Sequence, residues 1–593
     1  MIREDQRMSN SDQGHPSASR QEWMILLLFV IVAILLRAGL AQLDRVVKWD
    51  ESDYLMLGRN LWAGRGFTTA GYPELHYPPL LPALLGLTYA LTRNPELASN
   101  IWYILCGALL LLPYYGLARR SYGRRVGYMA VVLLLAFPAL AVSVLYWGTM
   151  SEPLYLLLIY SGLYAVWRAI DGDQPGRSSP AAYYALASLM FALAYLTRPE
   201  GILYFALFGA LIVGWRTVQG RLGRKETRRG LAVYVAIFLL CAMPYVLYLH
   251  QHTGQWTFSG KVGVTFALGG AVVERDPAGY DAATASLDDS GHHVIWFSPQ
   301  RFRQPGMLSQ VLADPAAYLK RVVSNARLWK GLFFTRTAFP FGLLGLVFLA
   351  LCKTPWTRQR AGRDRGEPGV RPLILLAATL PPFAFLALHI ELRFFAPLFP
   401  ILLLWVAKGL DDVGLWLRDT VQAWRSDRPF TRPVWGIALH ILPLLCLLVY
   451  FGLMQPVAAR QGQRGTDFSY KRVGLWMKEY TPPQARIMSR DVGVAVYAER
   501  AWVPSPHADL QAYLDYAAYH RVDYLVISER EATILRPMLA PLLVVNGRTL
   551  HASTADETSP PAKLELAYVD AGELRPNGEG GQAEGKTLVY RLR

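Results

Sequence analysis

Cysteine and charged residues are both scarce in this chain of 593 residues. The four cysteines, Cys106, Cys241, Cys352 and Cys446, lie in or at the ends of apolar segments and form no close-spaced pair. That spacing argues against a disulfide framework or a zinc site and favours small core residues. Charged residues make up only 18% of the chain and hydrophobic residues 53%, a balance shifted away from soluble domains.

The common catalytic motifs are missing too. No G-x-S-x-G, H-E-x-x-H, G-x-G-x-x-G or Walker sequence stands in the right context, so the chain gives no sign of a serine hydrolase, zinc peptidase or nucleotide-binding enzyme. The net charge is +16. Because the basic residues fall mostly in short loops, with no basic face carrying interleaved aromatics, we interpret them as topological signals and expect no nucleic-acid partner.

Long apolar runs are what the chain has in quantity. They recur from Trp23 to Met454, each near the ~20 residues that cross a hydrocarbon core as a helix. The predicted fold is therefore mostly α, a polytopic membrane helical bundle of about 11 spans. The expected spans are 23–43, 97–118, 126–147, 151–170, 181–197, 201–217, 231–250, 333–352, 372–390, 394–410 and 434–454.

Loop charge predicts the orientation of this bundle. Arginine and lysine crowd segments that share one side if the spans alternate, and the positive-inside rule makes that side cytoplasmic. These segments are 119–125, 168–177, 216–229, 353–371 and 418–432. The chain is thus expected in the cell (inner) membrane, in contact with membrane lipids, with its N-terminal tail, 1–22, in the cytoplasm.

The expected domains follow from this orientation. Residues 23–454 form the transmembrane module, with outer loops 44–96 and 251–332, and residues 455–593 form an extracytoplasmic domain. Helix and strand patterns alternate in that domain, which predicts a small α/β unit. Tyr77–Thr92 is too short for a span and has three prolines at its start, so we expect a juxtamembrane helix or a shallow re-entrant piece.

Acidic residues stand in the outer loops. Asp50 and Glu51 follow the first span and precede a predicted amphipathic helix, Ser52–Ala63. Asp50 either caps this helix or supplies a general base or metal ligand near the bilayer surface. Glu152 precedes Pro153 at the start of a span. It either stabilises that helix N-terminus or shares a site with Asp50 at the same outer depth.

Basic residues occur in the same outer region, against the topological trend. Arg198 and Arg393 lie in connections of a few residues between spans. They either snorkel to the interface or hold an anionic headgroup, because the planar guanidinium suits phosphate. Lys261, beside a glycine, is a weaker candidate for the same anion. His76 and Tyr77 either edge the site or form a simple turn.

Six short motifs occur in an order that resembles the polytopic GT-C glycosyltransferases, over roughly residues 25–410. They are WDESDY at 49–54, AGRGF at 63–67, YPPL at 77–80, SEPL at 151–154, LTRPEG at 196–201 and RFFAPLFP at 393–400. The pattern is most similar to the protein O-mannosyltransferases, the lipid A aminoarabinose transferases and the bacterial RgtA/B/C/D-like group. It departs from them at Phe394, where a tyrosine is common.

The resemblance implies transfer of a hexosyl or pentosyl sugar, with inversion, from a polyprenyl-phosphate donor to an envelope acceptor that is a protein, lipid or glycan. It makes Asp50 the catalytic base with Glu51 beside it, and Glu152 the second-loop carboxylate. Arg393 corresponds to the basic residue at the lipid phosphate. Asp50 and Glu152 would hold a divalent metal, Mg²⁺ or Mn²⁺, if one is used.

Two other classes of protein fit some of these features. A secondary transporter or flippase of a lipid-linked or small anionic substrate would also have many spans. Transporters, however, place ionisable residues near the midplane, whereas these spans are nearly free of central charge. A membrane anchor for residues 455–593 would leave the outer carboxylates and arginines unexplained.

Overall fold

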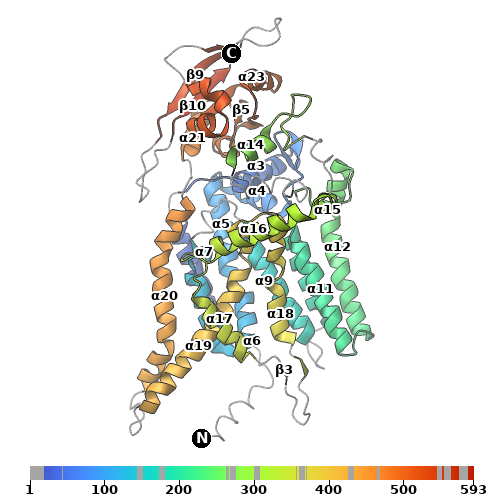
Figure 1. Ribbon diagram of the computed structural model, residues 1–593, viewed down its shortest axis with the longest axis vertical. Helices are drawn as coiled ribbons and strands as arrows, with labels where there is room; N and C mark the ends of the chain where they lie inside the picture. Colours follow the sequence, from blue (N-terminus) through green and yellow to red (C-terminus); the bar gives the residue numbers. More distant parts are fainter. Residues whose placement is uncertain are drawn as a thin grey trace.

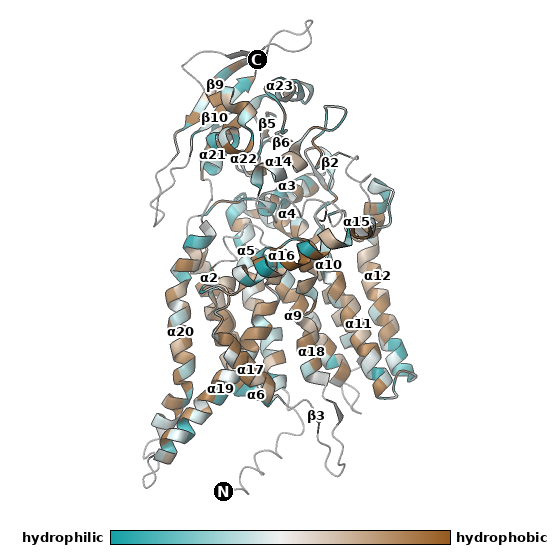
Figure 2. Cartoon of the chain, viewed as in Figure 1, coloured by the Kyte–Doolittle hydropathy of each residue, from teal (hydrophilic) through white to brown (hydrophobic). Residues whose placement is uncertain are grey.

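A bundle of helices and a mixed β-sheet form the two ends of the molecule (Figure 1). The computed structural model describes residues 19–42, 45–142, 151–171, 180–261, 266, 276–298, 307–354, 357–358, 367–368, 370–424, 433–463, 468–543, 550–552, 562–572 and 585–592. The bundle helices are mostly hydrophobic along their length, whereas hydrophilic residues are frequent at the sheet end (Figure 2).

Apolar helices make the bundle. They are α2 (Arg20–Leu40), α5 (Pro95–Leu109), α6 (Leu111–Ala136), α7 (Pro138–Ala141), α9 (Ser151–Asp171), α10 (Pro180–Tyr195), α11 (Gly201–Val218), α12 (Lys225–Thr253), α17 (Leu343–Lys353), α18 (Val370–Ala378), α19 (Leu398–Trp424) and α20 (Pro433–Gln463). Within the described ranges, six helical stretches are long and apolar enough to cross a membrane, and four apolar helices are shorter. The predicted membrane bundle of mostly α structure is confirmed at this level.

Two predicted spans differ from the helices in the structure. The predicted separation of 97–118 from 126–147 agrees with it, because non-helical backbone at Gly123, whose φ of +89° suits glycine, divides α6 into two helices. The predicted span 333–352 is helical only from Leu343, after Pro340. The predicted span 372–390 leaves the α-helix at Ala378 and continues as a 3₁₀ helix, η2 (Pro381–Ala387), because two prolines begin that segment and lack N–H donors.

Helices α3 (Asp50–Trp62) and α4 (Leu80–Thr92) lie together at the sheet end of the bundle (Figure 1). A small hairpin of β1 (Thr68–Thr69) and β2 (Tyr72–Pro73) stands between them in the chain. Their backbones touch at Gly58 and Gly86, where a Cβ on Gly86 would lie 2.4 Å from the Gly58 carbonyl oxygen. At ~1.5 Å per residue, the 13 residues of α4 are too short to cross the bilayer core, and it is one of the shorter apolar helices.

The segment between α12 and α17 supplies α14 (Pro277–Ala285), α15 (Met307–Ala313) and α16 (Pro315–Phe333). Helix α16 runs across the bundle rather than along it (Figure 1). Its last turns pack aromatic rings against the segment that links α18 to α19, including Trp329 against Phe383, with ring centroids 5.3 Å apart. That segment contains η2 and a second 3₁₀ helix, η3 (Leu392–Phe395).

The C-terminal residues form a six-stranded sheet in the order β6-β5-β7-β10-β9-β8. Strand β5 pairs in parallel with β6 and β7, and β10 pairs antiparallel with β7 and β9. The elements are α21 (Ser469–Tyr480), β5 (Arg486–Ser489), α22 (Val492–Ala498), β6 (Ala501–Pro504), α23 (Leu510–Tyr519), β7 (Tyr524–Ser528), η4 (Glu531–Leu535), η5 (Pro537–Leu543), β8 (Leu550–Ala552), β9 (Ala562–Asp570) and β10 (Thr587–Leu592). A two-stranded pair, β3 (Thr357–Arg358) and β4 (Glu367–Pro368), lies at the opposite end of the bundle.

Polar contacts fasten this sheet unit above α3. The Tyr497 hydroxyl of α22 donates to Glu96 Oε1 at 2.7 Å and accepts from the backbone N–H of Val47 at 2.9 Å. On α14, the buried Asp281 carboxylate accepts hydrogen bonds from Arg490 Nε at 2.8 Å and Arg536 Nε at 2.7 Å. The sheet unit is thus bound both to the start of α3 and to the loop helix α14.

Candidate active site

Asp50 lies at the first residue of α3, where the chain turns sharply. The preceding residue, Trp49, has φ of +52°, an unusual conformation for a residue with a side chain. Arg393 Nη1 donates to Asp50 Oδ2 at 2.9 Å, and the Tyr77 hydroxyl donates to Asp50 Oδ1 at 3.0 Å. Tyr77, 27 residues away in the chain, and Arg393, 343 residues away, therefore meet at one carboxylate.

The charges around Asp50 keep it ionised. Burial raises its pKa, but the cations of Lys261 and Arg393, together with the hydrogen bond from Arg393, lower the pKa from 3.8 to about 2. The Lys261 ammonium also lies 4.7 Å from the centre of the Tyr77 ring, whose hydroxyl binds Asp50. Asp50, Tyr77, Lys261 and Arg393 thus form one cluster, and the sequence had given Lys261 as a weaker candidate for this site.

A second ion pair stands next to the first. Arg198 Nη1 donates to Glu152 Oε1 at 2.7 Å and to the Ser151 hydroxyl at 2.9 Å, at the first turn of α9. Glu152 is almost fully buried, with 1% of its side chain exposed. The Phe394 ring lies between the two arginines, 5.5 Å from the Arg198 guanidinium and 5.2 Å from that of Arg393. The residue that departs from the family pattern thus separates two cations.

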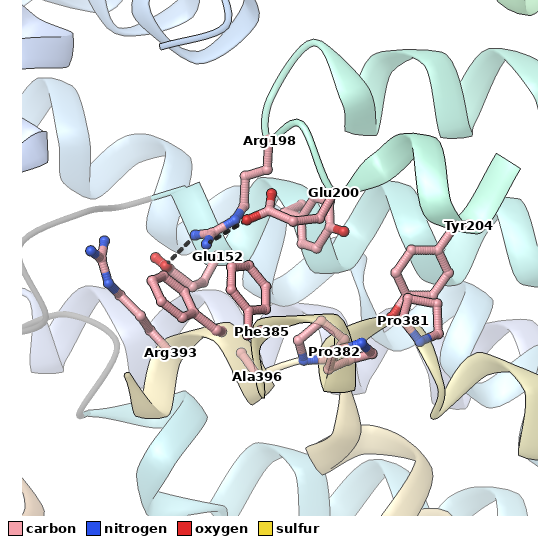
Figure 3. A pocket seen from close by; sticks show the side chains of 12 residues that line it. Glu152, Arg198, Glu200, Tyr204, Pro381, Pro382, Phe385, Arg393 and Ala396 are labelled. Carbon is pink, nitrogen blue, oxygen red and sulfur yellow. Dashed lines mark hydrogen bonds and ion pairs between the residues drawn. The ribbon is translucent and has the colours of Figure 1, made fainter. Parts of the chain in front are cut away.

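A small, partly open cavity lies beside these arginines. One side is polar and carries Glu152, Arg198 and Arg393, while η2 and η3 supply an apolar side. Figure 3 shows Arg198 directed toward Glu152 and Glu200, with the proline and phenylalanine side chains opposite. The lining residues are Glu152, Tyr155, Arg198, Glu200, Tyr204, Pro381, Pro382, Phe385, Arg393, Phe394, Ala396 and Pro397. This lining combines guanidinium groups, which suit an anionic head group, with apolar side chains, which suit an apolar chain.

Arg393 links the cavity to Asp50. Besides Asp50, its guanidinium binds the carboxylate of Glu391 through Nε. Burial lowers the pKa of Arg393, but the charges of Glu391, Asp50 and Glu152 outweigh burial and raise the pKa well above its ordinary value. The Arg393 cation is therefore permanent, and it faces Asp50 on one side and the cavity on the other.

The structure places Glu51 away from this cluster. Its carboxylate is fully buried and binds Arg45 through two hydrogen bonds, of 2.7 and 2.8 Å. Arg45 Nε in turn donates to Asn100 Oδ1 at 3.1 Å. Glu51 therefore ties the start of α3 to α5, and its oxygens are not directed toward Asp50. This arrangement is typical of a structural ion pair.

His76 lies behind the site rather than in it. Its ring stacks on Trp296 with 3.9 Å between ring centroids, and its Nδ1 lies 3.3 Å from Glu74 Oε1. The same Glu74 oxygen accepts from the backbone N–H groups of His76 and Tyr77. His76 and Glu74 therefore hold the backbone of Tyr77 in place, which agrees with the turn interpretation more than with the ligand one.

Asp53 is a neighbour that the sequence reasoning did not assign. Its Oδ2 lies 3.4 Å from the Tyr77 hydroxyl. Burial and the negative charge of Asp50 raise the pKa of Asp53 well above its ordinary value. Asp53 lies three residues after Asp50 on a helix and hence on the same face, so helical spacing could have identified it. The pKa values of the two carboxyl groups are thus shifted in opposite directions.

The residues present do not fit a resident divalent metal. A metal was expected on Asp50 and Glu152, yet each of these carboxylates is bound by an arginine, Arg393 and Arg198 respectively. Over the described ranges, no group of three or more histidine, cysteine, aspartate or glutamate side chains is arranged to hold a metal ion. No reaction step below is assigned to a metal.

Comparison with known proteins bears on the fold. The family model described as dolichyl-phosphate-mannose-protein mannosyltransferase matches residues 76–248. The archaeal oligosaccharyltransferase AglB from Archaeoglobus fulgidus, in complex with an inhibitory peptide and a dolichol-phosphate, superimposes with a TM-score of 0.54 at 14% identity. The match covers 86% of this chain and 70% of that one. ArnT from Cupriavidus metallidurans, bound to undecaprenyl phosphate, gives a TM-score of 0.53 at 15% identity, covering 96% and 98%.

The chain has the fold of the GT-C glycosyltransferases. The resemblance predicted from the sequence motifs is confirmed, and with it an integral membrane protein. A further structure of the Archaeoglobus fulgidus oligosaccharyltransferase, in complex with Zn and sulfate, has a TM-score of 0.52 at 15% identity and covers 90% of this chain and 72% of that one. No curated protein matches the chain. At such low identity the structural likeness establishes the fold alone.

Proposed function

We propose that this protein transfers a sugar from a polyprenyl-phosphate donor to an acceptor on the extracytoplasmic face of the membrane, with inversion. The observation that carries the proposal is the shared position of Arg393, which binds Asp50 and lines the cavity that also holds Arg198. A phosphate between the two arginines would leave the polyprenyl chain against the apolar wall of η2. The sugar would then lie toward Asp50.

The reaction requires one base and no strong acid. Asp50 takes the proton from an acceptor hydroxyl, the hydroxyl oxygen bonds to the anomeric carbon, and the bond from that carbon to the phosphate oxygen breaks. The electron pair leaves with the polyprenyl phosphate, whose charge the arginines stabilise. Attack on the face opposite the leaving phosphate inverts the anomeric carbon, as in the single displacement of inverting glycosidases.

Donor binding would adjust the strength of this base. With a pKa of about 2, Asp50 holds a proton weakly, because Lys261 and Arg393 stabilise its charge. The sugar-linked phosphate of the donor is a phosphodiester and carries one negative charge. Bound between Arg393 and Arg198, it would take over part of the positive charge of Arg393. Removing a cation's influence raises the pKa of a buried carboxylate, so Asp50 becomes a better base when the donor is in place.

The other outer-loop residues have supporting roles in this scheme. Glu152 holds the Arg198 guanidinium at 2.7 Å and so orients it toward the cavity. Tyr77 fixes one oxygen of Asp50 and leaves the carboxylate directed by two hydrogen bonds. We assign Glu51, which pairs with Arg45, to the fold of α3 and not to the chemistry.

Loop charge supports the proposed orientation. Arg119 and Arg124, from the first arginine-rich segment, both lie within hydrogen-bond or ion-pair distance of Glu22 at the start of α2. Asp50 follows the other end of α2, so the arginine-rich segment and the site lie at opposite ends of that helix. If the arginines mark the cytoplasm, the site and the sheet unit of residues 455–593 are extracytoplasmic, with the N-terminus in the cytoplasm of a cell (inner) membrane protein.

Mass spectrometry of lipid-linked sugars and envelope glycans in a deletion strain tests this function. We expect a polyprenyl-phosphate sugar to accumulate and one envelope glycan on a protein, lipid or polysaccharide to disappear. Uptake of a sugar or lipid-linked substrate into vesicles, without formation of a glycoside by the purified protein, would instead support the transporter alternative.

A further inference from the structure

The segment that carries Arg393 has little regular structure of its own. It follows the 3₁₀ helix η2, and the last carbonyl groups of such a helix have no partner within it. Buried carbonyl groups without partners are costly, so another element must supply donors. Those donors come from α16, the helix that runs across the bundle (Figure 1).

Asn325 of α16 makes that connection. Its side-chain Nδ2 donates to the Leu386 carbonyl oxygen at 2.9 Å and to the Leu388 carbonyl oxygen at 3.2 Å. Asn325 is fully buried. The opposite amide orientation would place Oδ1 against two carbonyl oxygens, so the hydrogen-bond chemistry fixes which end faces the segment.

Aromatic contacts complete the attachment on both sides of Arg393. Trp329, one turn after Asn325 on α16, packs edge-on against Phe383 at 5.3 Å and lies 5.7 Å from Phe395. The helix therefore contacts the segment both before and after Arg393. Because Arg393 binds Asp50 and lines the cavity, its position depends on this attachment.

We infer that Asn325 is a positioning residue for donor binding: it holds the carbonyls of Leu386 and Leu388 so that Arg393 faces the donor phosphate. This inference rests on the proposed function. Removing the Asn325 amide leaves two buried carbonyl groups without their donor. We expect this to displace Arg393 and so to weaken phosphate binding roughly tenfold or more.

The chain offers a matched control in Gln455 of α20. Its Nε2 donates to the Ala136 carbonyl oxygen at 2.7 Å. Within the described residues, Asn325 Oδ1 and Gln455 Oε1 are both buried without a hydrogen-bond partner. Each amide therefore acts as a donor to backbone carbonyls, with two bonds from Asn325 and one from the partly buried Gln455. Gln455 joins α20 to the end of α6, away from Arg393. Both Asn325→Leu and Gln455→Leu remove an amide that donates to backbone carbonyls, but only the Asn325 bonds reach the arginine segment.

The test uses the full-length purified protein and undecaprenyl phosphate as the probe. We expect Asn325→Leu to raise the dissociation constant roughly tenfold, Gln455→Leu to change it less than about twofold, and Asn325→Ser, which keeps one donor, to fall between. In an Arg393→Gln background, Asn325→Leu should add less than about twofold, because the two residues act in series. Hydrogen exchange of residues 386–395 should rise in Asn325→Leu and not in Gln455→Leu.

Equal binding by Asn325→Leu and Gln455→Leu would overturn the inference. So would a tenfold loss that persists unchanged in the Arg393→Gln background, since the effect would then not pass through Arg393. If Asn325→Leu does not fold, the same two comparisons are decided by Asn325→Ser. Failure of the wild-type protein to bind the probe would overturn the proposed function, and with it the role of Asn325 in donor binding.

Discussion

The substitution Glu51→Gln separates a structural ion pair from a catalytic one. Glu51 was expected beside Asp50 in the chemistry, but its carboxylate is fully buried and bound by Arg45 through two short hydrogen bonds. Removing one partner of a buried pair leaves an uncompensated charge, here on Arg45, and costs about 3–5 kcal/mol. Against a typical domain stability of about 5–15 kcal/mol, that is a large loss.

Thermal unfolding and activity per folded molecule measure the two roles separately. We expect Glu51→Gln to lower the unfolding midpoint and the yield of folded protein, while the folded fraction keeps near wild-type transfer activity. The double variant Arg45→Met with Glu51→Leu should recover much of the stability, because buried pairs are often replaced by apolar residues at little cost. A Glu51→Gln protein with wild-type stability and no transfer activity would refute the reasoning and return Glu51 to the chemistry.

Three further outcomes are expected. Arg393→Gln should raise the pKa of Asp50, because one of the two cations that lower it is lost while burial remains. The fall of kcat/KM on acidification, as Asp50 gains a proton, should then begin at a higher pH than in the wild type, and an unchanged profile would contradict this. Asp53→Asn should keep transfer activity and should be at least as stable as the wild type at pH 7. The pKa of Asp53 is higher in the folded than in the unfolded protein, so at a pH above the unfolded value this carboxyl group opposes folding. A large loss of activity would make Asp53 essential. Asp281→Asn should lower the unfolding midpoint by weakening the bonds to Arg536, and should make the sheet unit easier to release by limited proteolysis; unchanged proteolysis would contradict a clamping role.

The positions of Asp50 and Arg393 could be predicted because topology brings them together. Each follows or precedes an apolar span, so alternation of spans places both at the same membrane surface. The same reasoning brought Arg198 and Glu152 to that surface, and the structure joins them in one ion pair. Lys261 lies on a long loop, and only the fold brings its ammonium near Tyr77.

Neighbouring residues were harder to distinguish. Successive residues on a helix point about 100° apart, so Asp50 and Glu51 face different partners although they are adjacent in the chain. The structural role of Glu51 follows from its contact with Arg45, which in turn binds Asn100. Neither partner belongs to a sequence motif that would have predicted this contact. Asp53 could have been found from its helical spacing with Asp50.

The direction of α16 across the bundle could not be predicted from the sequence either. The apolar residues around 333–352 predict one span, whereas the helix across the bundle ends at Phe333 and a new one begins at Leu343. Length and hydropathy do not separate a helix that spans the bilayer from one that lies along its surface when the two follow each other closely. The contact from Asn325 to Leu386, sixty-one residues away, has no local signal.

Transfer by the Asp50→Asn variant tests the central claim most directly. Membranes from the deletion strain contain both the acceptor and the accumulated donor, so adding purified protein and following release of polyprenyl phosphate measures the reaction. The account predicts that Asp50→Asn binds undecaprenyl phosphate but releases product ~10²–10⁴-fold more slowly than wild type, whereas Asp53→Asn does not. Wild-type release by Asp50→Asn would contradict the account.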